Sequence, residues 1–142
     1  MLLTILLLFI PLAFAQSGSS LTIIHPRNPS HQNDIYSIKC NKECDLNVKA
    51  SFKRKGNSGL ENFDSKINDV ISIASNGFPV AGKLLSHQVL YSIQATSGDK
   101  KIDVTLGYPK RYLGADYQKY SDLIVKIEEI KREIISSTTE VK

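Results

Sequence analysis

The two cysteines, Cys40 and Cys44, are the first candidates for chemistry in this chain, and three interpretations of the pair are open. A metal site would need two more soft ligands, yet the histidines (His25, His31 and His87) show no ligand spacing to one another or to the pair. A redox enzyme places its nucleophilic cysteine at a helix start, whereas this pair alternates with polar residues as in a strand. We therefore favour a structural disulfide, and the sequence indicates no metal or cofactor site.

The histidines offer little sign of catalysis. His25 and His31 flank a proline-bearing loop, and His87 opens a segment of alternating apolar residues. The sequence contains no nucleophile-elbow serine and no glycine-rich phosphate loop. It therefore favours a protein without a catalytic centre. The alternative is a small secreted hydrolase or nuclease with a dispersed site built on His87, His31 or a carboxylate. A pocket joining a histidine to a carboxylate would favour the enzyme, and a flat polar surface would favour a binding module.

Three short basic runs are candidates for anion binding. They are Lys53, Arg54 and Lys55, then Lys100 and Lys101, then Lys110 and Arg111. The formal net charge is +4 at pH 7, which is compatible with an anionic partner. If the runs converge, they form a surface for lipid headgroups, polysaccharide or nucleic acid, whereas scattered solvated charge is the competing interpretation. We expect the partner to be a protein or an anionic surface.

Residues 1–15 have the pattern of a secretory signal peptide. An apolar run ends in Ala13, Phe14 and Ala15, which places small residues at the −3 and −1 positions of a cleavage site. The uninterrupted apolar stretch is too short to span a bilayer comfortably. We expect cleavage before Gln16 and a secreted protein, either extracellular or periplasmic. An oxidising destination agrees with a disulfide.

Two pairs of alternating segments predict the β-hairpins that would position these residues. In the segment from His87 to Tyr108, Gly98 and Asp99 suit a two-residue type II′ turn, and only Leu90 breaks the alternation. In the other segment, a disulfide between the cysteines closes a three-residue loop and contributes about 2 kcal/mol. The predicted cross-strand pairs are Ala95 with Ile102, Ile93 with Val104, Tyr91 with Leu106, Cys40 with Cys44, Ile38 with Leu46, and Tyr36 with Val48.

Two helices follow from the 3.6-residue period. The first begins at a capping box of Ser58 and Glu61 and stops at Asn76 and Gly77, although the β-branched run 70–73 leaves a strand as the alternative. Its apolar residues are Leu60, Phe63, Ile67, Val70, Ile71 and Ala74. The second covers 115–136. Its apolar stripe consists of Tyr117, Tyr120, Leu123, Ile124, Ile127, Ile130 and Ile134.

These elements predict an α+β fold with two layers, an antiparallel sheet built from two hairpins and two helices packed on one face. The expected boundaries are a leader and connector over 16–33, one α+β domain over 34–136 and a disordered tail over 137–142. Residues 21–24 are expected to form at most a short edge strand. The predicted function is that of a small non-catalytic binding or interaction module, such as an inhibitor or effector acting on another macromolecule.

Overall fold

The computed structural model describes residues 18–27, 32–75, 77–79 and 84–142. The signal-like segment 1–15, His31 and Asn76 lie outside the described residues, so the expectations for them stay predictions. The elements in chain order are β1 (Ser19–Pro26), β2 (Asn33–Cys40), β3 (Glu43–Lys49), β4 (Lys53–Gly59), α1 (Leu60–Ser75), the 3₁₀ turn η1 (Ser86–Gln88), β5 (Val89–Ser97), β6 (Lys100–Gly107), the 3₁₀ turn η2 (Pro109–Arg111), α2 (Ala115–Ser136) and β7 (Thr139–Glu140).

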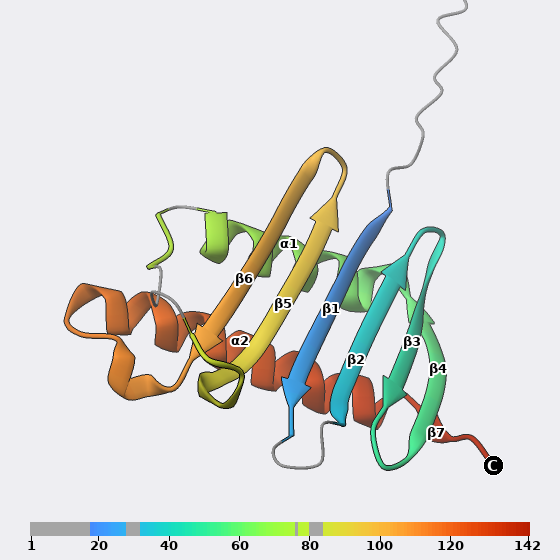
Figure 1. Cartoon of the computed structure of the whole chain (residues 1–142). Helices are drawn as coiled ribbons and strands as arrows, with labels where there is room; N and C mark the ends of the chain where they lie inside the picture. Colours follow the sequence, from blue (N-terminus) through green and yellow to red (C-terminus); the bar gives the residue numbers. More distant parts are fainter. Residues whose placement is uncertain (1–17, 28–31, 76, 80–83) are drawn as a thin grey trace, which may run out of the picture.

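The strands form a single antiparallel sheet in the order β6-β5-β1-β2-β3-β4-β7. Both helices run behind this sheet, and the described elements leave its other face uncovered (Figure 1). Alternate strand residues such as Leu21, Ile38, Leu46 and Ile93 are buried against the helices. The predicted α+β class with two layers is therefore confirmed. The uncovered side is called the open face below.

Both predicted hairpin registers are confirmed. Ala95 lies opposite Ile102 and Tyr91 opposite Leu106, while Gly98 has a φ of 63°, as a primed turn requires. Leu90, the residue that breaks the alternation, is the extra residue of a bulge between Val89 and Tyr91 in β5. In the other hairpin, all three predicted pairs form, including the one between the two cysteines, which are joined by a disulfide and buried.

The first strand differs from the expectation for 16–33. We expected a leader with at most an edge strand, but β1 lies in the middle of the sheet, between β2 and β5. Leu21 pairs with Ile38 on one side and with Ala95 on the other. The second partner is far away in the sequence, so local alternation could not reveal that both edges of β1 are occupied.

The segment after β3 also differs. In the sequence, apolar residues alternate from Cys44 to Phe52, which would extend the strand to Phe52, and the predicted helix is capped at Ser58. Instead β3 ends at Lys49, a turn follows, and Lys53–Gly59 forms β4, after which α1 begins at Leu60. The Ser58 hydroxyl accepts a hydrogen bond from the Asn62 side chain at 2.8 Å. The sequence of β4, KRKGNSG, lacks apolar alternation because the C-terminal segment packs against its inner face.

The expected disordered tail is ordered in the structure. Thr139–Glu140 pairs with β4 as β7, and the Val141 amide donates to the Lys53 carbonyl at 2.8 Å. Thr138 is buried, with 4% of its surface exposed. Arg54 holds this segment with hydrogen bonds to the Thr138 carbonyl (2.5 Å) and hydroxyl (3.1 Å) and to the Ile135 carbonyl (3.2 Å). The tail is thus held by hydrogen bonds from Arg54, and a pattern of apolar residues in the sequence could not reveal this.

The helices match the predicted periodicity closely. In α1 the buried residues are Phe63, Ile67, Val70, Ile71 and Ala74, so the helix interpretation of the β-branched run is correct. The bounds of α2 are those predicted, and its buried stripe comprises Tyr120, Leu123, Ile127, Ile130 and Ile134. Tyr117 is an exception, with 47% of its surface exposed near the start of α2.

Candidate functional site

The open face presents polar side chains in rows that run across the strands. Cross-strand partners share a face, so each row can be followed from β6 to β4. The row nearest the β3–β4 turn reads Thr105, Ser92, Ile24, Ile35, Lys49, Lys53. The next reads Asp103, Gln94, Thr22, Ser37, Asn47, Lys55. The third reads Lys101, Thr96, Ser20, Lys39, Asp45, Asn57.

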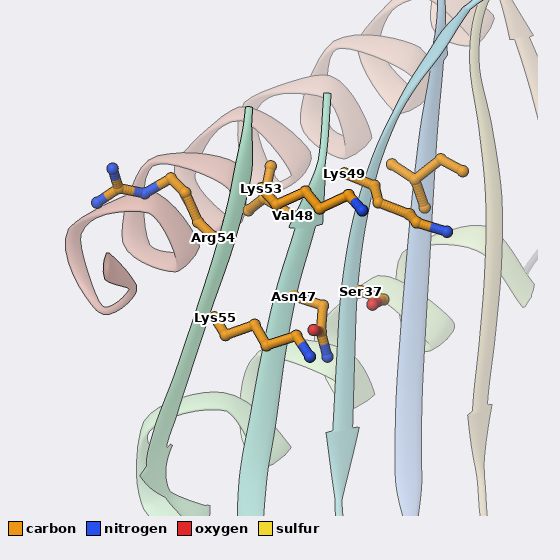
Figure 2. Close-up of a pocket in the computed structure, with 8 residues that line it drawn as sticks. Ser37, Asn47, Val48, Lys49, Lys53, Arg54 and Lys55 are labelled. Carbon is orange, nitrogen blue, oxygen red and sulfur yellow. The ribbon is translucent and has the colours of Figure 1, made fainter. Parts of the chain in front are cut away.

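Lys49, Lys53 and Lys55 gather at one side of this face, and we call them the lysine patch. They line a shallow depression of about 360 Å³ together with Ser37 and Asn47. Figure 2 shows the three side chains extending across β3 and β2, with the Lys55 amino group close to Asn47. All three lysines are exposed. The patch therefore offers three amino groups, one hydroxyl and one amide to a ligand lying on the sheet.

The charge of the lysine patch is uncompensated among the residues the structure describes. None of the described lining residues is acidic, and none of the ion pairs between described residues includes these three lysines. Lys49 and Lys53 lie directly opposite each other across β3 and β4. Like charges in that relation destabilise a sheet, so a bound anion would relieve their repulsion.

The basic run in β4 is divided between the two faces. Lys53 and Lys55 point to the open face, whereas Arg54 points the other way and binds the C-terminal segment (Figure 2). The alternation of side chains along a strand makes this division unavoidable. The lysine patch thus contains Lys49 and not Arg54, which the basic run had predicted. Lys49 could not be predicted as part of the patch because the sequence did not show where the β3–β4 turn lies.

The other two basic runs lie elsewhere. Lys101 stands on the open face of β6, while Lys100 lines a depression of about 610 Å³ with Asp69 and Ser72 of α1. Strand β6 is five interstrand spacings from β4, or about 24 Å. That separation is about three Debye lengths at physiological salt, so the fields of the two edges do not add appreciably. The three predicted runs therefore do not form one continuous basic cluster.

Lys110 and Arg111 line a second basic depression, of about 600 Å³, with His87, Tyr108 and neighbouring residues. None of the described residues that line it is acidic. Arg111 reaches the open face, as the position of Gly107 shows. Leu106 is buried in the core, so Gly107 faces the open side, and a Cβ there would lie 3.0 Å from the Arg111 Cδ. We call this the arginine site.

Two tyrosines hold the strand end beside the arginine site. Tyr120 donates a hydrogen bond to the Gly107 carbonyl at 2.9 Å, and the Gly107 amide donates to the Tyr112 hydroxyl at 3.0 Å. The two rings stack with centroids 4.0 Å apart. Burial raises the pKa of Tyr120 to about 12 and also raises the pKa of Tyr112, so both hydroxyls stay protonated near neutral pH. The contact fixes the turn that carries Lys110 and Arg111.

A polar cluster between the sheet and α2 was not predicted. The Tyr91 hydroxyl donates to Glu128 and accepts a hydrogen bond from the Lys131 amino group at 2.7 Å. Lys131 also lies over the Tyr36 ring, 5.1 Å from its centroid. Burial, followed by the hydrogen bond to Glu128, raises the pKa of Tyr91. These polar groups satisfy one another, so the cluster adds directional contacts to the apolar stripe that packs α2 on the sheet.

Of the three histidine candidates, the structure describes His25 and His87. His25, half-buried, donates from Nδ1 to the Leu90 carbonyl at 2.9 Å. Within the described ranges, no three histidine, cysteine or acidic side chains gather as a metal site would require. None of the described helices has the length and apolarity needed to cross a membrane.

Compared with known proteins, the chain matches no protein-family model, no curated protein and no solved structure.

Proposed function

We propose that this chain is a secreted, non-catalytic binding module that uses the lysine patch to bind an anionic macromolecule. The observation that carries the proposal is the grouping of Lys49, Lys53 and Lys55 over Ser37 and Asn47, on a sheet face that the described elements leave uncovered. The amino groups attract the anion electrostatically, and the hydroxyl and amide groups can orient it through directional hydrogen bonds. Both kinds of contact are common at surfaces that bind polyanions.

The geometry favours a binding module over the hydrolase or nuclease considered as the alternative. The enzyme would need a histidine beside a carboxylate, but the described residues around His87 are basic, aromatic or neutral. The lysine patch likewise contains no described acidic group that could act as a general base. Both sites instead suit recognition of negative charge without bond cleavage.

Secretion is supported by two independent features. Residues 1–15 have a signal-peptide pattern, and the bonded pair of Cys40 and Cys44 is typical of oxidising compartments. The disulfide bond fixes the turn of the β2–β3 hairpin, at the far end of the two strands from Lys49. A bond there stabilises the hairpin while leaving the lysine patch accessible.

The test compares two charge-reversed variants of the oxidised protein. One changes Lys49, Lys53 and Lys55 to Glu, and the other makes the same change of net charge at exposed residues away from the patch. The control positions are Lys42, Lys119 and Arg132. Heparin, anionic vesicles and single-stranded DNA serve as probes at low and moderate salt.

We expect the patch variant to lose most of its affinity for the preferred probe, with a log–log salt slope shallower by about two to three. The control variant should bind nearly as tightly as the wild type, because none of its changed residues lines the lysine patch and salt screens charges that are further away. If both variants lost affinity equally, binding would depend only on the net charge of the protein and not on the lysine patch. No binding of any probe by the wild type at low salt would overturn the proposal.

A further inference from the structure

The lysine patch and the arginine site stand at opposite ends of one row of the open face. The row runs from Lys53 and Lys49 to Thr105 in β6, two residues before Gly107. Arg111 packs over the open side of Gly107 and so lies beside this end of the row, about 7 Å further along β6. The two basic sites therefore share one face, although they are separated by the width of five strand spacings, about 24 Å.

The row between the two sites is free of negative charge. Its middle members are Ser92, Ile24 and Ile35. The next two rows along the strands each contain a carboxylate, from Asp103 in the second row and Asp45 in the third. A linear anion crossing the sheet would meet repulsion along the second or the third row, but none from a side chain within this one.

We propose that a single acidic polysaccharide lies across the strands along this row, with the lysine patch and the arginine site each binding its carboxylate or sulfate groups. The inference rests on the proposed function and names the class of its ligand. A hydroxyl from Ser92 and one from Thr105 face the chain, and the Ile24–Ile35 pair offers a small apolar surface for the faces of sugar rings.

The composition of the open face argues against a nucleic acid in the same place. Proteins that bind single strands stack the bases on aromatic side chains spaced along the groove. At the open-face positions of the described strands, every residue is aliphatic, glycine, hydroxyl-bearing, amide-bearing or charged. The exposed aromatic residues near the two sites are Tyr108 at the arginine site (44% exposed) and Phe52 in the β3–β4 turn (38% exposed), and neither lies along the row between them.

Joining two weak sites through one ligand has a measurable consequence. Once one end of the chain is bound, the other end is held near the second site at a high effective concentration. A polysaccharide long enough to span about 24 Å should therefore bind 10²–10⁴ times more tightly than a fragment that reaches only one site. A disaccharide is too short to bridge the sites and should bind at two independent places.

The experiment measures heparin disaccharide and full-length heparin against four proteins by calorimetry. These are the wild type, Lys49→Gln with Lys53→Gln, Lys110→Gln with Arg111→Gln, and the combination of all four changes. Glutamine removes the charge but keeps the side chain as far as Cδ, the Arg111 atom that packs over Gly107. A matched control, Lys100→Gln with Lys101→Gln, removes the same charge from the far end of β6.

With full-length heparin, each pair of changes should lower the affinity by tenfold or more, and the control pair should lower it by less than threefold. The disaccharide should bind the wild type at two sites and each double variant at one. If only the lysine-patch pair weakens heparin binding, the bridge is disproved while the proposed function stands. If neither pair weakens it, both fail. Tighter binding of single-stranded DNA than of heparin at equal charge would overturn the choice of polysaccharide.

Discussion

Gly56 provides a direct test of how the C-terminal segment is held. The glycine lies in β4, and a Cβ built there would stand 2.3 Å from the Ser137 carbonyl oxygen, closer than real Cβ contacts allow. The obstacle is backbone and cannot turn aside as a flexible side chain would. Gly56→Ala should therefore displace residues 137–142 from β4 and leave the rest of the sheet intact.

The expected cost follows from the bonds that this displacement breaks. Arg54 loses two hydrogen bonds to Thr138, and the backbone bond from Val141 to Lys53 is lost. Bonds from a charged donor contribute about 1.5–3 kcal/mol each when well formed, but these are partly exposed and coupled. Replacing a strand glycine also restores about 0.5 kcal/mol. We expect the free energy of unfolding to fall by about 2–3 kcal/mol.

The assay is a double-mutant cycle between Gly56→Ala and a truncation after Ser136, followed by urea unfolding. In the full-length chain the substitution should destabilise. In the truncated chain it should be neutral or slightly stabilising, because the carbonyl it meets is gone. Hydrogen exchange at the Val141 amide should rise in the full-length variant. An equal cost in both backgrounds would refute the account of the tail as a bound segment.

Two further predictions concern the hairpin and the strand end. Replacing Cys40 and Cys44 by alanine should lower the free energy of unfolding by about 2 kcal/mol, measured by urea unfolding. The hairpin register should be unchanged in cross-strand NMR contacts, and a changed register would contradict the prediction. Because folding raises the pKa of Tyr120, wild-type stability should decline as the pH rises from 10 to about 12. Tyr120→Phe should lose less over that window in urea melts, and parallel curves would contradict this.

Local patterns in the sequence predicted those parts of the fold that depend on near neighbours. Turn chemistry at Gly98 and alternation on both sides of it determined the β5–β6 register. The same reasoning placed Cys40 opposite Cys44, and the apolar period gave both helices. In each case the partners are close in sequence or share one helix, so a short window contains the information.

The parts that were missed depend on distant partners. Strand β1 lies inside the sheet only because β5 pairs with its second edge. Strand β4 has no apolar pattern of its own, and Arg54 and Gly56 make sense only through their contacts with the C-terminal segment. The candidate site had the same limit. The run containing Lys53 and Lys55 was visible, but Lys49 joined it through a turn whose position the alternation did not show. The distance to Arg111 required the complete strand order.

The central place of β1 has a consequence for how the chain folds. Strands β2, β3 and β4 follow one another through short turns, and β5 with β6 forms a separate hairpin, so both groups can form from local contacts. They become one sheet only when β1 pairs with both. Until β5 arrives, β1 pairs at most with β2, and its other edge is free to pair with any extended peptide, including another copy of itself. Docking of the β5–β6 hairpin onto β1 is therefore the step at which productive folding competes with aggregation.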